Sequence, residues 1–376
     1  MTAFALKPEQ VAFAASVREV AERELLPLVR AGREGKVNRP LLAAMGRLGL
    51  LARLFPESGD APATELCLLR ESLAQVTTEA ETALALQGLG GHPIASAGRP
   101  DVVRRWVPAI ARGEAVAAFA LSEPGAGSDA AALSLRAKPD GAGWRLTGEK
   151  TWISNAPQAD VYTVFARTIE DARSRGVTAF VVDGAAEGVG GEALEMLSPH
   201  PIGRLLLDGV YVGADAVLGQ VDGGFGVAMA TLNLFRPSVG AFAVGMAQAA
   251  LDAAITHAGS RTAFGAPLAQ MQSVGHTLAE MATRTEAARL MVYAAAAAYD
   301  RGDADVPKRS AMAKLFATET AQYVVDAAIQ IHGARGLERG HLLEHLYREV
   351  RAPRIYEGAT EVQRSIIARE LSARNE

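Results

Sequence analysis

The periodicity of the apolar residues changes twice along the chain, and this change constrains the fold more than any other feature. Up to about residue 112, apolar residues recur at the spacing of amphipathic helices. From about residue 117 to 219, short apolar runs alternate with glycine and proline, which is typical of strands joined by turns. Helical periodicity returns at Phe225 and continues to the end. This order favours separate helical and β regions over alternating βαβ units.

The same periodicity predicts individual elements. In the first region, one helical pattern runs without a break from residue 63 to 89. Gly302 and Gly333 are suitable C-terminal caps for two of the later helices. The expected strands lie at 144–147, 161–165, 178–182 and 205–212, and the expected later helices at 225–258, 267–301, 307–332, 339–349 and 359–373.

The composition argues against several classes of protein. A chain of 376 residues is too long for one ordinary core and suggests two or three lobes. The 38 Lys and Arg residues balance 42 Asp and Glu residues without a long basic run, which argues against nucleic acid as a partner. Cys67 is the only cysteine, so no disulfide forms within the chain. Without an uncharged apolar stretch of membrane-spanning length or a signal-peptide pattern, we expect a cytoplasmic protein that does not insert into membranes.

Two segments of the middle region suit a flat ligand. The first, LSEPGAGSD at 121–129, follows a strand and combines glycines with hydroxyl groups, so its backbone amides can approach a flavin edge or a phosphate. It is neither a Walker A loop nor a G-x-G-x-x-G motif. The second is KTWISN at 150–155, where Trp152 can stack on a ring beside the hydroxyl of Ser154. An ordinary turn and a core tryptophan remain alternatives.

The last region holds two further candidate segments. Arg261 and Phe264 combine a guanidinium with an aromatic ring, which suits a diphosphate and a neighbouring ring. The segment QIHGARG at 330–336 reads as a helix end. A solvated arginine at a helix terminus is the alternative for Arg261.

Glu357 lies in the segment RIYEGATEVQ, after two apolar residues and before a glycine. Apolar surroundings disfavour the charged carboxylate and raise its pKa, as a general base working near neutral pH requires. A solvated glutamate near a helix N-terminus is the alternative.

Two other patterns are weighed against structural roles. His341 and His345 match the H-x-x-E-H pattern of some zinc peptidases, but no third ligand is evident downstream, so surface or subunit contacts are favoured over zinc. Cys67 lies within an apolar helical pattern and reads as a buried structural thiol.

In order and spacing, these segments together resemble the acyl-CoA dehydrogenase family over nearly the whole chain. The matching stretches are LSEPGAGSD, GEKTWISNA, the run from 223 to 252, RTAFGAPLAQMQ, QIHGARG and RIYEGATEVQ. The resemblance implies an α+β, mostly α fold with an N-terminal helical domain at 1–115, a central β-barrel-like domain at 116–222 and a C-terminal four-helix bundle at 223–376. It also implies FAD as cofactor, a homotetramer or dimer, and an electron-transferring flavoprotein as acceptor in acyl-CoA catabolism.

The resemblance assigns roles to single residues. Glu357 corresponds to the catalytic base of the short- and medium-chain branch. In another branch the base precedes an arginine that resembles Arg236, and here Phe235 occupies that position and cannot take a proton. The implied cofactor-binding residues are Leu121, Ser122, Gly127, Ser128, Trp152, Ser154 and Thr360, together with Arg261, Phe264, Gln272, Gln330 and Gly333, which would reach the FAD of a neighbouring subunit. The implied substrate-binding residues are Ser128, Asn233, Arg236 and Gly358.

The resemblance implies the reaction as well. Glu357 would take the α-proton of an acyl-CoA thioester, and its own backbone amide with a ribityl hydroxyl would stabilise the enolate-like charge. A hydride would pass from the β-carbon to flavin N5, leaving a trans-2-enoyl thioester. Ala359, Ala334 and residues 197–203 depart from the usual family pattern. The alternatives are a flavoenzyme of this fold that acts on a carrier-protein thioester or a non-thioester substrate, and a non-catalytic paralogue.

Overall fold

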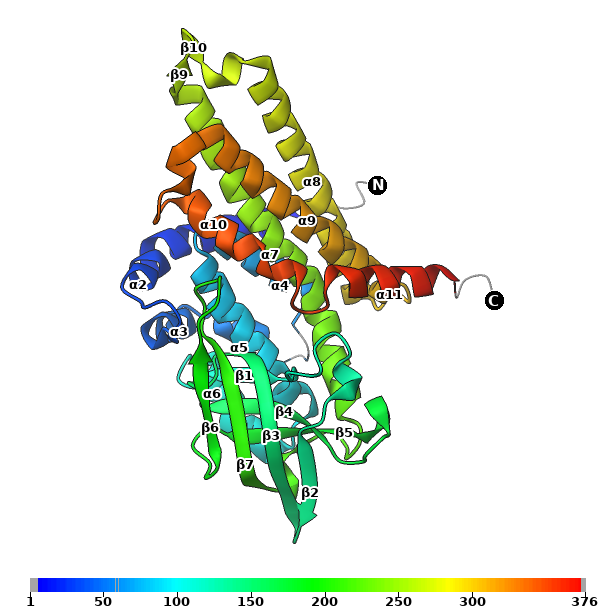
Figure 1. Cartoon of the computed structure of the whole chain (residues 1–376). Coiled ribbons are helices and arrows are strands. Elements are labelled where there is room, and N and C mark those ends of the chain that lie inside the picture. The colour runs from blue at the N-terminus through cyan, green and yellow to red at the C-terminus, as the bar shows by residue number, and fades with distance from the viewer. Residues whose placement is uncertain (1–5, 58, 60, 373–376) are drawn as a thin grey trace. The chain divides into compact units, whose positions relative to one another are not determined.

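The computed structural model describes residues 6–57, 59 and 61–372, in which helices precede and follow a single large sheet along the chain (Figure 1). Contacts divide the chain into two compact units. Unit 1 comprises Met1–Arg23, Pro62–Glu81 and Asn233–Glu376, and unit 2 comprises Glu24–Ala61 and Thr82–Leu232. The domain boundaries expected from the sequence, at 115/116 and 222/223, remain a prediction.

Unit 1 is helical. A short hairpin, β9 (Thr262–Ala263) and β10 (Ala266–Pro267), joins its two longest helices. The turn η6 (Leu268–Gln270) follows this hairpin, and the turns η7 (Gly333–Leu337) and η8 (Ala352–Arg354) connect other helices. Its helices are α1 (Pro8–Val20), α4 (Ala63–Ala74), the first turn of α5 (Thr78–Ala97), most of α7 (Gly224–Ser260), α8 (Gln272–Arg301), α9 (Val306–His332), α10 (Leu342–Val350) and α11 (Thr360–Ser372).

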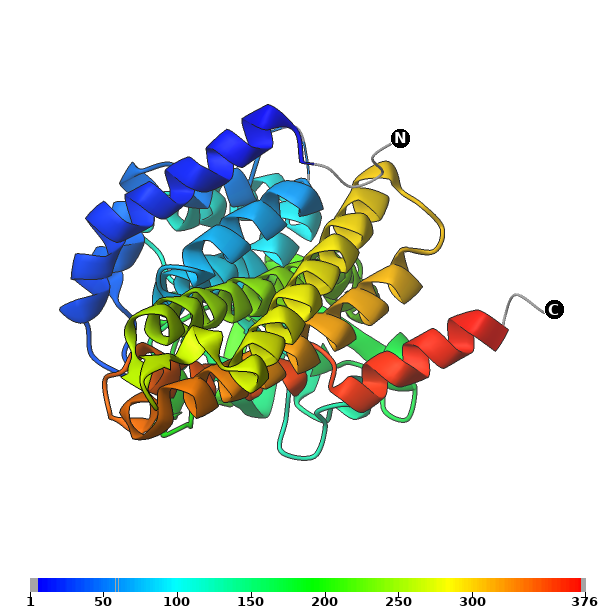
Figure 2. The same cartoon turned by 90° about the horizontal axis from the view of Figure 1, so that it is seen from above.

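Small residues allow the helices of unit 1 to pack closely. Helices α8 and α9 lie side by side (Figure 2), and α10 and α11 both pack on α9. A Cβ added at Gly240 of α7 would meet Val292 of α8 at 2.7 Å, and one at Gly245 would meet the Glu71 carbonyl at 2.5 Å. Gly302 ends α8 in the left-handed conformation that favours glycine. Gly240 and Gly245 therefore allow α7 to approach α8 and α4 closely.

Helix α7 is the one described helix that is long and apolar enough to cross a membrane by length and composition. However, 72% of its most apolar window is buried within the protein. Such burial is what the core helix of a globular protein shows.

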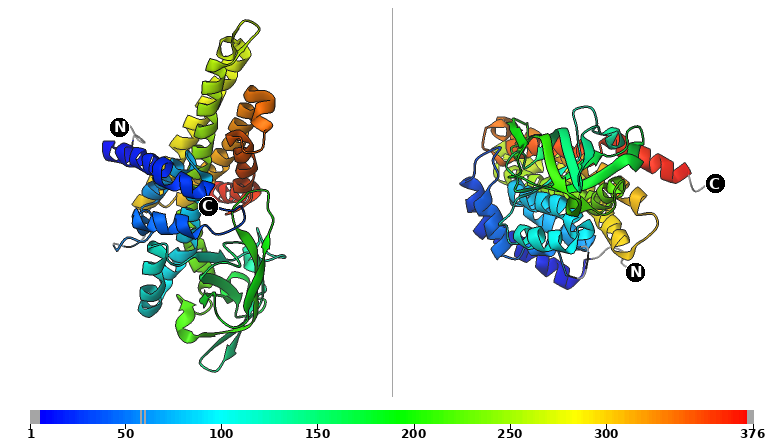
Figure 3. Two further views of the ribbon diagram at one scale, coloured as in Figure 1. Left: turned by 90° about the vertical axis from the view of Figure 1, so that its left-hand side faces the viewer. Right: turned by 90° about the horizontal axis from the view of Figure 1, so that it is seen from below.

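Unit 2 combines short helices with the sheet, whose strands lie next to one another in Figure 3 (right). The strand order is β6-β7-β3-β2-β4-β5-β8, with β1 parallel to β4. Its helices are α2 (Leu26–Arg30), α3 (Arg39–Arg47), the rest of α5 and α6 (Pro100–Ala111), with the turn η2 (Leu51–Leu54). Its strands are β1 (Ala117–Ala120), β2 (Arg136–Asp140), β3 (Gly143–Ser154), β4 (Val161–Arg167), β5 (Val177–Asp183), β6 (Val189–Leu194), β7 (Ile202–Gly213) and β8 (Val217–Leu218).

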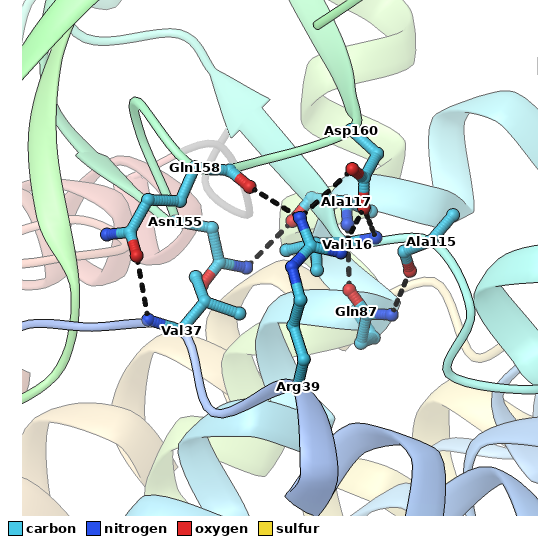
Figure 4. Close-up of polar contacts among 9 residues, drawn as sticks. All are labelled: Val37, Arg39, Gln87, Ala115, Val116, Ala117, Asn155, Gln158 and Asp160. Atoms are coloured by element: carbon cyan, nitrogen blue, oxygen red, sulfur yellow. Dashed lines mark hydrogen bonds and ion pairs between the residues drawn. The ribbon is translucent and has the colours of Figure 1, made fainter. Parts of the chain in front are cut away.

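A polar network fixes the start of strand β1 (Figure 4). Gln87 of α5 donates to the carbonyl of Ala115 and accepts from the amide of Ala117, at 2.7 and 2.8 Å. Asn155 donates to the Ala117 carbonyl at 2.8 Å. Asp160 accepts from the Val116 amide at 2.7 Å and pairs with Arg39. Buried side chains thus hold the strand that leads directly into the loop 121–129.

Most predicted elements are confirmed. The expected strands lie within β3, β4, β5 and β7, and the later helices match α7 to α11 to within a few residues, although α8 begins at Gln272 and not at 267. The unbroken helix expected at 63–89 is wrong, because α4 ends at Ala74 and α5 begins at Thr78. There the hydroxyls of Thr77 and Thr78 bond Glu79, and such local bonds compete with helix continuation. Strands β2 and β6 were not predicted.

Candidate active site

Glu357 lies in a strained turn of unit 1 between η8 and α11. Its φ is +52°, in the left-handed region that non-glycine residues rarely adopt, and Gly358 follows with φ +96°. Side chains hold the carbonyl groups of this turn. Lys314 Nζ and Gln363 Nε2 donate to the Gly358 carbonyl at 2.7 and 2.8 Å, and Gln363 Nε2 lies 3.3 Å from the Glu357 carbonyl. The turn is thus fixed from helices α9 and α11.

The Glu357 carboxyl group is buried, and part of it makes no hydrogen bond to the described residues. Its Oε2 atom is buried and has no hydrogen-bond partner among the described residues. Burial raises the pKa of Glu357, while the cations Arg70, Lys314 and Arg236 oppose that rise. A carboxylate whose pKa is raised and whose lone pairs are unused has the properties of a general base near neutral pH.

Arg236 of α7 is 8% exposed, and its Nε is buried without a partner among the described residues. Its Nη1 donates to Asn233 at 2.9 Å, so the structure brings these two predicted substrate residues together. Burial lowers the pKa of Arg236, and Glu357 opposes that change. A buried guanidinium with an unused donor suits an oxygen acceptor.

A buried ion pair joins Arg70 of α4 to Glu81 of α5 within unit 1. Arg70 also donates to Ser238 at 2.8 Å, and its guanidinium lies 5.8 Å from the Phe242 ring centroid. The negative charges of Glu81 and Glu357 act on Arg70, whose pKa is raised overall despite the opposing effect of burial. The surroundings of Glu357 are therefore more charged than an apolar core.

The loop 121–129 of unit 2 is tied to strand β3 by a second buried lysine. Lys150 Nζ donates to the Leu121 carbonyl at 3.0 Å and pairs with Glu123 at 2.8 Å. The Thr151 amide donates to the Ser122 carbonyl at 3.0 Å. The structure thus brings together the two segments that the sequence marked for a flat ligand.

Around this junction, side chains and backbone are left uncovered. Trp152 is 50% exposed with φ +56°, and Ser154 is partly buried. The positions where Gly125 and Gly127 would carry a Cβ have no atom within 4 Å, and Ser128 is exposed. An exposed indole beside accessible amides and hydroxyls suits a planar heteroaromatic ligand.

A second group of predicted cofactor residues lies at the far end of α9. His257 of α7 stacks on His332 with ring centroids 4.1 Å apart, which places the segments of Arg261 and Gln330 at the same end of these helices. Phe264, between β9 and β10, is 98% exposed, and Gln272 and Gly333 are exposed as well. Gln330 follows Lys314 by 16 residues in α9, a separation of about 24 Å along a helix. This group therefore does not share a site with Glu357 within unit 1.

The comparisons with known proteins decide the family. Residues 7–114, 118–210 and 222–372 match the N-terminal, middle and C-terminal domains of acyl-CoA dehydrogenase. The chain is 36% identical to the probable acyl-CoA dehydrogenase fadE25 of Mycobacterium leprae, over 98% of this chain and 96% of that protein. It is 34% identical to cyclohexane-1-carbonyl-CoA dehydrogenase of Geobacter metallireducens, over 95% of both. Butyryl-CoA dehydrogenase from Megasphaera elsdenii matches with a TM-score of 0.92 and 30% identity, covering 98% and 99% of the two chains.

The chain belongs to the acyl-CoA dehydrogenase family. It is an FAD-dependent oxidoreductase that dehydrogenates acyl-CoA, and the three-domain fold expected from the resemblance is confirmed. The residues around Trp152 fit FAD, because they offer an exposed indole and open backbone. Thr360 is different: it is 6% exposed and its hydroxyl donates to Glu319 at 3.0 Å, so its proposed cofactor role stays a prediction.

The two histidines of the zinc-like pattern have other contacts in this acyl-CoA dehydrogenase. His341 Nδ1 accepts from the Leu343 amide at 3.1 Å and caps α10. His345 Nε2 lies 2.6 Å from the Thr78 hydroxyl. No cluster of three His, Cys, Asp or Glu residues in the described part of the chain could hold a metal ion. Cys67 is fully buried, and burial raises the pKa of its thiol.

Sequence reasoning did not find Arg70, Glu81, Lys314 or Gln363. Each lies within a helical pattern, where a charged or polar residue is usually on the solvent face. One signal was present for Lys314, since it interrupts the small and apolar run AMAKLFA without an acidic residue nearby in the helix turn.

Proposed function

We propose that Glu357 abstracts the α-proton of an acyl-CoA and that the product is the trans-2-enoyl-CoA. The observation that supports this most is the buried Glu357 Oε2 without a partner, on a turn whose conformation is strained. Strain and raised pKa values concentrate at functional sites, where surrounding contacts enforce them.

The residues of this chain would contribute positioning, desolvation and charge. Burial keeps water from Glu357 and brings its pKa toward that of a base that works near neutral pH. Arg236, with its unused donor, is the candidate for contact with a substrate oxygen. When bound, FAD accepts the hydride that leaves the β-carbon.

A variant pair tests the base. Purified protein is titrated anaerobically with acyl-CoAs of increasing chain length, and bleaching of the flavin absorbance is recorded. Glu357→Gln should bind FAD but bleach at least ~100-fold more slowly, because removal of a general base costs that much or more. Glu361→Gln is the matched control, since Glu361 is exposed on the neighbouring α11. If the flavin of Glu357→Gln were bleached at the wild-type rate, the assignment of Glu357 as the base would be wrong. A wild type that no acyl-CoA bleaches would favour carrier-protein or non-thioester substrates.

We also propose that a neighbouring subunit's FAD, in a homotetramer or dimer, is bound by the group of Arg261, Phe264, Gln272, Gln330 and Gly333. An electron-transferring flavoprotein is the proposed electron acceptor. The position of this group supports the first point, because Gln330 lies about 24 Å along α9 from Lys314, the residue that contacts the turn of Glu357. Arg261→Ala should lower the FAD content of an otherwise folded protein. Sedimentation that gives a monomer with full FAD occupancy would contradict the proposal.

A further inference from the structure

Lys314 is an unusual residue for its position. It lies in α9, is 0% exposed, and its ammonium group donates to the Gly358 carbonyl at 2.7 Å. No carboxylate of the described residues lies within ion-pair distance of its ammonium group. Burying an unpaired ammonium is costly, so a structural role alone would be served better by an apolar side chain.

The carbonyl that Lys314 contacts belongs to the turn of the base. Thr360 and Arg354 flank this turn and both bond Glu319 of α9, at 3.0 and 2.9 Å. Those contacts fix where the turn begins and ends. Between them, the direction of the peptide after Glu357 depends on the two buried donors Lys314 and Gln363. A Cβ at Gly358 would come within 2.5 Å of Gln363 Nε2, which shows how closely the donors surround this peptide.

We propose that Lys314 is a positioning residue for the reaction: it holds the Gly358 carbonyl, and thereby the left-handed conformation that directs the Glu357 carboxylate to the substrate. Its positive charge also favours the ionised form of Glu357. This inference rests on the proposed role of Glu357 as the base.

The charges around Lys314 come from four elements. Glu357 lies on the turn, Arg236 on α7, Glu319 on α9 itself and Glu361 on α11. Glu319 is already paired with Arg354, and Glu361 is exposed. Burial lowers the pKa of Lys314 to about 8, with Glu357 the largest opposing charge. The ammonium group is therefore present below pH 8 and is lost above it, while the Glu357 carboxylate forms as pH rises through its own pKa.

The test uses the FAD-bound enzyme with an acyl-CoA that bleaches it. In Lys314→Met, kcat should fall on the order of 100-fold, the cost typical of a misplaced catalytic group, with KM changed much less. The acid limb of the kcat profile should move to higher pH, because a cation that favours the carboxylate is gone. Lys308→Met is the matched control on the same helix, where the lysine pairs with Asp305 at 3.7 Å, and it should keep both kcat and profile.

Lys314→Arg separates positioning from folding. Arginine keeps the charge and does not lose its proton in this pH range. We therefore expect partial activity and loss of the alkaline limb of the kcat profile near pH 8. If Lys314→Met does not retain FAD, the Lys314→Arg variant tests the positioning role in its place. Wild-type kcat and profile in Lys314→Met, or an unchanged alkaline limb in Lys314→Arg, would overturn the proposal. An active Glu357→Gln enzyme would instead overturn the proposed function on which it rests.

Discussion

Each unit contains a buried lysine that donates to a carbonyl of a candidate site loop. Lys150 holds Leu121 in unit 2 at 3.0 Å, and Lys314 holds Gly358 in unit 1 at 2.7 Å. Both lysines are 0% exposed, and burial lowers both pKa values to about 8. The two differ in their counter-charges: Lys150 pairs with Glu123 at 2.8 Å, whereas the main negative charge acting on Lys314 is the candidate base.

The difference shows that a buried lysine can stabilise a loop in one unit and act on a candidate catalytic carboxylate in the other. Burial alone would raise the pKa of Glu123, but Lys150 and the amides of Ser134 and Leu135 outweigh it and leave the pKa lowered. Lys150 and Glu123 thus compensate each other's charge, and their role is structural. The Glu357 pKa is raised overall, so its carboxylate is only partly compensated and stays reactive. Four experiments separate the two cases, beginning with the largest expected effect.

Removal of the two carboxylates should have opposite consequences. Glu357→Gln should lose the ~100-fold or more of reduction rate that a general base contributes, and should keep its stability. Glu123→Gln should lose stability, because it leaves Lys150 buried without a counter-charge, but should reduce its flavin normally once folded. Stopped-flow reduction and thermal unfolding of both variants measure the contrast. Equal stability losses would remove the distinction.

Removal of the lysines should also separate the two sites. Lys150→Met breaks a buried pair, a change that typically costs about 3–5 kcal/mol of unfolding free energy. Lys314→Met removes a buried charge that lacks a carboxylate in contact. Its loss of unfolding free energy should therefore be smaller than the increase in activation free energy that corresponds to its loss of kcat. Denaturant unfolding followed by flavin fluorescence compares the two. If Lys314→Met lost more unfolding free energy than its loss of kcat represents, the role of Lys314 would be structural, like that of Lys150.

The double variant Lys150→Met/Glu123→Leu sharpens the comparison. Replacement of a whole buried pair by apolar side chains is often nearly neutral. We therefore expect the double variant to regain most of the stability that Lys150→Met loses. Because Glu123 also accepts from Ser134 and Leu135, recovery should fall short of complete by about 1 kcal/mol. No recovery would show that Lys150 acts through the Leu121 carbonyl and not through Glu123.

The last comparison is the pH dependence of stability, which is spread over more than two pH units. The folded pKa of Lys314, about 8, lies below the unfolded value of 10.5, so the unfolded state binds more protons between these values. Stability should therefore rise with pH from 8 to 10.5 relative to Lys314→Arg, by at most about 1.4 kcal/mol per pH unit. Thermal midpoints of both proteins across this window measure it. If the difference between the two thermal midpoints stayed constant with pH, the ammonium group of Lys314 would be more hydrated than the structure indicates.

Part of the fold and site could be predicted from sequence, and the failures have identifiable causes. The sequence order of helices, strands and helices was readable because long apolar periodicity survives in any tertiary context. Strand β6 was missed because its residues, Val189–Leu194, are glycine-rich and largely exposed. Strand β2 was missed because it ends at the turn signal Pro139-Asp140-Gly141. Glu357 was singled out as the candidate base because its segment RIYEGATEVQ, in order with the other segments, resembles the acyl-CoA dehydrogenase family; its local pattern alone left a solvated glutamate as the alternative.

The amino-acid sequence by itself determined the family, the helix and strand order and the candidate base, since these depend on short segments and on their order and spacing along the chain. The tertiary structure alone decided which charges surround that base. Arg70, Arg236 and Lys314 come from α4, α7 and α9, and no local pattern shows which face of each helix meets the turn at Glu357. The physical reason is that a pKa depends on burial and charge at short range in space, and these distances exist only after the helices have packed.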